Sequence, residues 1–418
     1  MKTLGNLQET VMIFQRTFTI RQMVQIGFSV PSKIARIDLR FKRYLYSLIN
    51  WDARIISIKG ARGVGKTTML LQYILENYED LDRTLYVSLD DLWFSSHDLM
   101  DLVDWADRHG VTRLYLDEVH RYPGWSLVLK NIYDNYPDMS IVYTGSSLLV
   151  IDNAVADMSR RQTSYTLYGL SFREFLDIEG ILNYNPVPLE DLLRFHVKMA
   201  MEIVGKVKVA PLFEKYLCYG YYPFYRENVD DFLSRLRETV TVVFDSDLPA
   251  VEKITFDTVR KAKKLLMIIS ENVPFEPNMS ALWHQLSTDN ELGLKMLYSL
   301  DKAQVLLLLT AKTKNYKSLV KPQKIYLGNP NLMHALCPTV DKGNERETFF
   351  LSQLRVRHDA CYPPKGDFLI DDKFLFEVGG KGKSFDQIAE VPDSYLAVDD
   401  TEVGHGNRIP LWLFGFLY

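Results

Sequence analysis

The sequence predicts an α/β protein whose N-terminal part is a parallel β-sheet with helices on both faces. From residue 51 to about 176, short apolar runs of strand length alternate with segments of helix length. Such alternation favours a parallel sheet, because each connecting helix returns the chain to start the next strand in the same direction. Several of the runs end in polar residues, as strands next to a ligand site do. At 418 residues the chain is too long for one core, so two or three domains are expected.

Composition narrows the class of protein. Hydrophobic residues make up 47% of the chain, which is enough for packed cores. The net charge of −4 argues against a globally basic nucleic-acid binder, although it does not exclude a local basic patch. Cys218, Cys337 and Cys361 are far apart and have no metal-ligand spacing, so a cytoplasmic location is expected. We expect no signal peptide and no membrane helix, because no apolar run approaches the roughly 20 residues needed.

The first strand–helix junction has the sequence of a phosphate-binding loop. The apolar residues 55–58 lead into Gly-Ala-Arg-Gly-Val-Gly-Lys-Thr, a full Walker A match, and a helix is expected over 67–78. Lys66 can reach the β- and γ-phosphates, and the Thr67 hydroxyl is placed to ligate Mg²⁺. The alternative is a glycine-rich turn with an incidental lysine, which the strand before and the helix after disfavour. The predicted ATP-binding residues are Gly60, Ala61, Arg62, Gly63, Val64, Gly65, Lys66, Thr67 and Thr68.

Four more strands complete the expected sheet. Helices are expected between them over 96–108 and 125–136. The expected strands are 83–89, 112–118, 140–147 and 163–168.

Two carboxylates end the strand over 112–118. Asp117 follows apolar residues at the carboxyl end of a buried strand, where it can hold Mg²⁺ through water. Glu118 is placed to polarise the attacking water, which favours a hydrolytic ATPase over a nucleotide kinase. The alternative is a pair of exposed loop carboxylates. Thr144 and Ser146 end the next strand and could sense the γ-phosphate, although Thr-Gly-Ser is also an ordinary turn.

Arg160 and Arg161 precede the last expected strand. An arginine there could neutralise transition-state charge, either within one copy or across a subunit interface, so an oligomer is one option. The alternative is a surface arginine pair.

Four motifs together resemble a bacterial and archaeal family of AAA+-like P-loop ATPases. They are GARGVGKT, LYLDEVHRYPGW, VYTGSS and the run over 161–175. The resemblance implies an ATPase joined to a winged helix and to a C-terminal domain of the restriction-endonuclease-like fold. It covers nearly the whole chain and is strongest up to about residue 176. Where the family has Gly-Arg this chain has Arg160-Arg161; by register Arg161 matches the family arginine, and which of the two contacts the nucleotide stays open.

The resulting division has four parts: a helical lead-in over 1–50, the ATPase core over 51–176, a helical region with a winged helix-turn-helix over 177–311, and the nuclease-like domain over 312–418. The winged helix rests on a helix–helix–helix–strand pattern at 256–269, 280–285, 289–300 and 305–309. Its second recognition element begins with Asp289 and Glu291, which would repel phosphate and more plausibly cap the helix. A lysine-rich stretch after 311 could contact a DNA backbone. A DNA or a protein partner is therefore expected.

The C-terminal domain contains a motif similar to the PD-(D/E)xK nuclease core. Asp367 and Glu377 are the candidate metal ligands, Glu347 fits an additional acidic position, and Lys381 is the candidate motif lysine. Glu377 and Lys381 are four residues apart rather than two, which along a straight strand is about 13 Å instead of about 7 Å. A glycine bulge at 379–380 could close that gap.

We therefore expect nuclease activity to be absent and ATP hydrolysis to be coupled to a partner. The alternatives are an ATP-regulated metal-dependent nuclease and a nucleotide-dependent switch with little turnover. The chain is expected to end in an apolar strand over 410–414.

Overall fold

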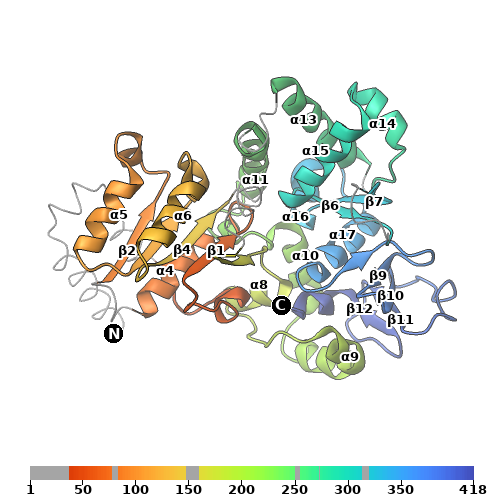
Figure 1. The fold of residues 1–418 in the computed structure, drawn as a ribbon. Helices are drawn as coiled ribbons and strands as arrows, with labels where there is room; N and C mark the ends of the chain where they lie inside the picture. The colour runs from red at the N-terminus through yellow and green to blue at the C-terminus, as the bar shows by residue number, and fades with distance from the viewer. Residues whose placement is uncertain (1–36, 78–82, 147–159, 250–254, 273, 313–319) are drawn as a thin grey trace. The chain divides into compact units, whose positions relative to one another are not determined.

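The computed structural model describes residues 37–77, 83–146, 160–249, 255–272, 274–312 and 320–418. The chain divides into two compact units, Met1–Tyr168 and Gly169–Tyr418 (Figure 1). Of the helical lead-in expected over 1–50, residues 1–36 lie outside the described part. Residues 37–50 contain a single 3-10 turn, Tyr44–Ser47, so that part of the expectation was wrong. Every helix in the described part of the chain is too short or too polar to cross a bilayer.

The N-terminal unit is built on a five-stranded sheet in the order β2-β3-β4-β1-β5, and all four strand pairs are parallel. The expected α/β class with a parallel sheet is therefore confirmed. The strands are β1 (Ile55–Lys59), β2 (Thr84–Ser88), β3 (Arg113–Asp117), β4 (Ser140–Gly145) and β5 (Thr163–Thr166). The helices are α4 (Lys66–Glu76), α5 (Leu99–Arg108) and α6 (Trp125–Asn135), with 3-10 turns at Leu92–Ser95 and Val119–Arg121.

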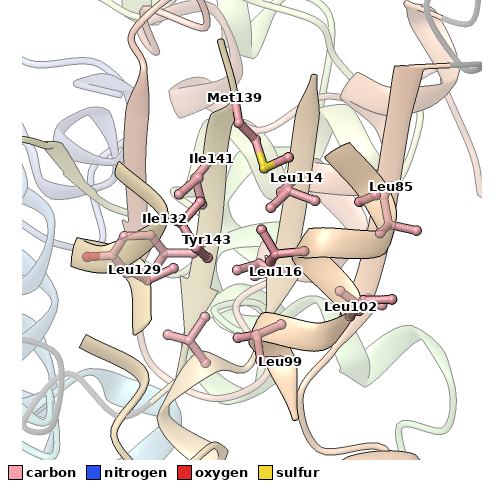
Figure 2. Packing of buried hydrophobic residues seen from close by; sticks show 14 of the residues in the cluster. Leu85, Leu99, Leu102, Leu114, Leu116, Leu129, Ile132, Met139, Ile141 and Tyr143 are labelled. Atoms are coloured by element: carbon pink, nitrogen blue, oxygen red, sulfur yellow. The ribbon is translucent and has the colours of Figure 1, made fainter. Parts of the chain in front are cut away.

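Helices cover both faces of this sheet. Leu114 and Leu116 of β3 belong to a buried cluster that also contains side chains from α5 and α6. Figure 2 shows these side chains packed between the strands and the two helices. Tyr115 points to the opposite face, because side chains alternate along a strand. There its ring lies 6.4 Å from that of Tyr73 on α4. This arrangement explains why the strands read as nearly continuous apolar runs.

The C-terminal unit begins with helices. They are α8 (Phe172–Ile178), α9 (Leu189–Val204), α10 (Val209–Tyr219) and α11 (Phe232–Val242), with a 3-10 turn at Pro223–Arg226 and a π-helical segment at Val243–Asp247. The N-terminus of α8 is fixed by a capping box, in which the Ser171 hydroxyl accepts from the Glu174 amide and the Glu174 carboxylate accepts from the Ser171 amide.

Three helices and a hairpin follow, in the order expected from the sequence. They are α13 (Phe256–Glu271), α14 (Met279–Leu286), α15 (Asn290–Lys302) and the antiparallel pair β6 (Leu306–Leu309) and β7 (Lys324–Leu327). Asp289 caps α15 by accepting a 2.8 Å hydrogen bond from the Leu292 amide. The acidic first turn of this helix therefore has a local structural use.

The last part of the chain forms a second, mixed sheet in the order β12-β11-β10-β9-β8. β8 and β9 run antiparallel to their neighbours, whereas β10, β11 and β12 are parallel. The strands are β8 (Ala360–Cys361), β9 (Phe368–Ile370), β10 (Phe374–Gly379), β11 (Ser394–Val398) and β12 (Arg408–Pro410), preceded by α16 (Pro330–Leu336) and α17 (Lys342–Leu354).

The expectation of a final strand over 410–414 was wrong. β12 ends at Pro410, and Leu411–Phe416 form a fully buried 3-10 helix. A short apolar run is compatible with either a buried strand or a buried helix, because burial on all sides removes the periodicity that distinguishes them.

Candidate functional site

The phosphate-binding sequence forms a tight loop between β1 and α4. Gly63 and Gly65 have φ of 79° and 95°, a left-handed conformation that glycine adopts without a steric penalty. Gly60 is needed for another reason, since a Cβ there would lie 2.3 Å from the Leu167 carbonyl oxygen. The loop therefore closes against the end of β5, and the first turn of α4 is held next to it. Amide groups at a helix N-terminus favour a bound anion.

Lys66 is buried at the start of α4, with 4% of its surface exposed. Its ammonium donates to the carbonyl oxygens of Gly60 and Ala61 at 2.8 and 2.9 Å. The cation is thus held within the loop by backbone acceptors that a phosphate oxygen could replace.

Thr67 and Asp117 meet at the carboxyl edge of the sheet. The Thr67 hydroxyl donates to Oδ2 of Asp117 at 2.7 Å. Tyr86, at 2.9 Å, donates to the same oxygen, and the Thr144 hydroxyl donates to Oδ1. Mg²⁺ takes oxygen ligands and retains several waters, so a hydroxyl beside a carboxylate is a donor set that fits this ion. The predicted pair Thr67 and Asp117 lies together, as does Thr144.

The Asp117 carboxyl is almost fully buried, with only 2% of the residue's surface exposed, and burial disfavours its charged form. Burial raises the pKa of its carboxyl above the ordinary value, and the neighbouring charge of Glu118 raises it further. The hydrogen bonds from Thr144, Thr67 and Tyr86 act in the opposite direction. A bound cation would stabilise the ionised form in the same way as these donors.

Glu118 directly follows β3 and adopts a left-handed backbone conformation with φ of 55°. Non-glycine residues seldom adopt this conformation, and it is enriched at functional sites. The Glu118 amide donates to Thr144 Oγ1 at 3.2 Å, and Oε2 accepts a 2.7 Å hydrogen bond from Ser146. Nδ1 of His120 lies 3.3 Å from the same oxygen. These contacts orient the carboxylate that the sequence predicts as catalytic.

His120 connects Glu118 to the phosphate-binding loop. Its Nε2 lies 3.4 Å from Nη2 of Arg62, while its Nδ1 is turned toward Glu118. Sequence reasoning missed His120 and Tyr86 as site residues. The signal for Tyr86 was its place on β2, next to the strand that ends in Asp117. His120 gave no comparable signal, because it lies in the 3-10 turn after β3 rather than on a strand. Only the conformation of that turn brings its side chain near Glu118.

The structure does not bring Arg161 to this loop within one copy of the chain. β5 runs parallel to β1 with Thr166 opposite Lys59, so Arg161 lies before the amino end of β5. The whole of β5 and the residue before it, about 16 Å of extended chain, separate Arg161 from the edge that carries the loop. Nη2 of Arg161 pairs with Asp134 of α6 at 3.3 Å. Arg160 is exposed.

The candidate ligands of the C-terminal sheet have different partners from those expected. Oε1 of Glu377 pairs at 2.9 Å with Lys383, not with Lys381. A Cβ at Gly379 would lie 2.7 Å from the Lys383 side chain, so glycine makes room for this pair rather than forming a bulge that returns Lys381. Asp367 lies 3.4 Å from Lys324.

Comparison with known proteins agrees with the geometry of the N-terminal unit. Residues 52–176 match a family model described as an AAA domain. The N-terminal sheet and its loop thus have the P-loop fold, and residues 52–176 are similar to an AAA domain. It is also similar to an uncharacterized protein of Methanocaldococcus jannaschii, with 27% identity over 93% of this chain and 91% of that protein.

Two solved structures are distant matches to this chain. DnaA from Aquifex aeolicus bound to AMPPCP has a TM-score of 0.27 and 18% identity, covering 62% of this chain and 84% of that one. PCH-2 of C. elegans has a TM-score of 0.26 and 16% identity, covering 48% of this chain and 59% of that one. Scores at this level carry no argument about function.

Proposed function

We propose that the chain binds ATP with Mg²⁺ at the AAA-type loop and hydrolyses it. The observation that carries the proposal is the meeting of Thr67 and Asp117 at 2.7 Å beside the loop, with Glu118 following on the same strand end. The match of residues 52–176 to an AAA domain supports it.

Each residue has a role that its contacts support. Lys66 exchanges its bonds to Gly60 and Ala61 for oxygens of the β- and γ-phosphates. Thr67 and Asp117 hold Mg²⁺, which when bound neutralises charge on the phosphate oxygens. Glu118 orients a water molecule for attack on the γ-phosphorus and accepts its proton. The Thr144 hydroxyl contacts both the Asp117 carboxylate and the Glu118 amide. A loss of the γ-phosphate could therefore shift both residues through Thr144.

The test is Lys66→Ala, measured by calorimetric titration with ATP and Mg²⁺ and by phosphate release. Binding should be lost or severely weakened, because the loop loses its mobile cation. Lys206→Ala is the matched control, since Lys206 is an exposed lysine paired with Glu202 in the other unit. ATP affinity unchanged by Lys66→Ala would refute the assignment.

We further propose that α13, α14, α15 and the β6–β7 hairpin form a winged helix, and that this region and the C-terminal sheet couple the nucleotide state to a DNA or protein partner. The order of three helices and an antiparallel hairpin supports the winged helix. The first turn of α15 is acidic, and Asn290 accepts a 3.0 Å hydrogen bond from the Trp283 indole. Phosphate release measured with and without DNA tests the nucleic-acid partner. A rate unaffected by DNA would favour a protein partner.

A further inference from the structure

Two carboxylates of the C-terminal unit share one buried lysine. Nζ of Lys324 lies 3.1 Å from Oε2 of Glu347 and 3.4 Å from Oδ1 of Asp367. Lys324 lies on β7, Glu347 on α17, and Asp367 just before β9, so the contact joins three elements distant in sequence. All three side chains are less than one fifth exposed.

The local backbone explains why the lysine is held there. Lys324 and Tyr326 are two residues apart on β7, so their side chains leave the same face of the hairpin. The Tyr326 hydroxyl donates to the same Glu347 oxygen at 2.6 Å. Asp367 is fixed from the other side, because its Oδ2 accepts a 2.9 Å hydrogen bond from the Val378 amide and its own amide donates to the Phe376 carbonyl.

The lysine neutralises only part of the charge of this cluster, because one ammonium faces two carboxylates. Burial on its own would lower the pKa of Lys324, but the charges of Glu347 and Asp367 outweigh it and hold that pKa above its ordinary value. Burial raises the pKa of Glu347, and the charge of Asp367 raises it further, while Lys324 and Tyr326 oppose the change. The lysine therefore stays charged, and it reduces the negative charge that the two carboxylates would otherwise offer to a second cation.

A divalent metal does not fit these residues as they are placed. The resemblance to nuclease-type sites implies a metal between Asp367 and Glu377, but each of these carboxylates already has an ammonium partner. Oε2 of Glu377 is buried and has no hydrogen-bond partner among the described residues. One such oxygen does not replace the six or more ligands that a hard divalent cation needs.

We propose that the Lys324 ammonium serves as the cation of the cluster formed by Glu347 and Asp367, in place of a divalent metal. This ammonium keeps divalent cations out and ties the β6–β7 hairpin to α17 and to the start of β9. The C-terminal unit then works without a metal. This inference does not depend on ATP hydrolysis in the other unit.

The test is a Mn²⁺ titration of the full chain without nucleotide, followed by electron paramagnetic resonance. All proteins carry Asp117→Asn, so that the P-loop oxygens contribute less to the signal. Lys324→Met should bind one Mn²⁺ per chain at least about tenfold more tightly than the parent, because two carboxylates lose their cation. Adding Glu347→Gln to Lys324→Met should abolish the gain. Lys321→Met is the matched control, since Lys321 is exposed and precedes the same strand.

Two results would overturn the proposal. One is stoichiometric Mn²⁺ binding by the parent that is lost in Asp367→Asn, because Lys324 would then not exclude metal. The other is a Lys324→Met variant that folds but binds Mn²⁺ no more tightly than the parent.

Thermal unfolding tests the same proposal if Lys324→Met folds too poorly for the Mn²⁺ titration. Its midpoint should fall well below that of Lys321→Met, and Glu347→Gln should restore part of the loss by removing an unpaired buried charge. A loss that Glu347→Gln leaves unchanged would count against the proposal.

Discussion

The Ser146 hydroxyl donates a 2.7 Å hydrogen bond to Oε2 of Glu118. Ser146 comes just after β4, and Glu118 comes just after β3, so the bond joins the ends of two adjacent strands. His120 approaches the same oxygen at 3.3 Å. The carboxylate proposed as catalytic is thus oriented by two neighbours, and this arrangement leads to the first two predictions.

Glu118→Gln should retain ATP binding and lose hydrolysis. The amide keeps the shape of the side chain but cannot accept a proton from water, and removal of a general base typically costs on the order of 10²- to 10⁴-fold in rate. Phosphate release and calorimetric ATP titration measure the two properties separately. Glu390→Gln, at an exposed glutamate, is the control. Turnover at the wild-type rate would place the catalytic carboxylate elsewhere.

His120→Ala should lower kcat by up to about tenfold with little change in KM, because Glu118 loses a neighbour whose Nδ1 lies 3.3 Å from its Oε2. His120 acts as a positioning residue here, through Glu118 and Arg62. The double variant with Glu118→Gln distinguishes positioning from a general loss of structure, because His120→Ala should have no further effect once Glu118 is gone. His109→Ala, at an exposed histidine after α5, is the control. A rise in KM with kcat unchanged would contradict the positioning role.

Asp117→Asn should weaken the Mg²⁺ dependence of ATP binding and stabilise the free protein at neutral pH. Because the pKa of Asp117 is raised in the folded state, its protonated form is favoured on folding. The protonated Asp117 carboxyl therefore favours the folded state at low pH. This contribution to stability is lost as the pH rises through the pKa that Asp117 has in the folded protein. The variant should therefore raise the thermal midpoint more at pH 8 than at about pH 4, close to the ordinary carboxyl pKa of 3.8. Asp107→Asn, at an exposed site, is the control. An equal shift at both pH values would show that ionisation of Asp117 is not the cause.

Arg161→Ala should reduce turnover only if copies of the chain associate, since Arg161 lies at the opposite edge of its own sheet. Mixing Arg161→Ala with Glu118→Gln tests this directly, because an Arg161 supplied by one inactive protein could complete the Glu118 site of the other. Activity recovered on mixing would establish a role across subunits. Full activity of Arg161→Ala alone would leave the pair with Asp134 as a surface contact. Arg160→Ala is the matched control and should have the smaller effect.

The sequence alone predicted the parallel sheet, the phosphate-binding loop and the carboxylates of the N-terminal unit, because the signals for these features come from residues close together in the chain. The Walker A spacing, the apolar strands and the carboxylates at the end of β3 depend on neighbouring residues, and parallel strands bring their carboxyl ends to one edge. Thr67, Asp117 and Thr144 could therefore be predicted to meet.

Tertiary structure decided the rest, where partners come from distant segments. Glu377 pairs with Lys383 because the chain turns after β10, and no spacing rule predicts that choice over Lys381. Lys324 reaches Glu347 and Asp367 only because the hairpin packs beside α17 and the C-terminal sheet. The apolar residues 411–416 are buried on every side, so their sequence has no periodicity that distinguishes a strand from a helix. Their 3-10 conformation is visible only in the folded structure. Side-chain contacts across long sequence separations are set by packing, and packing is a property of the whole fold.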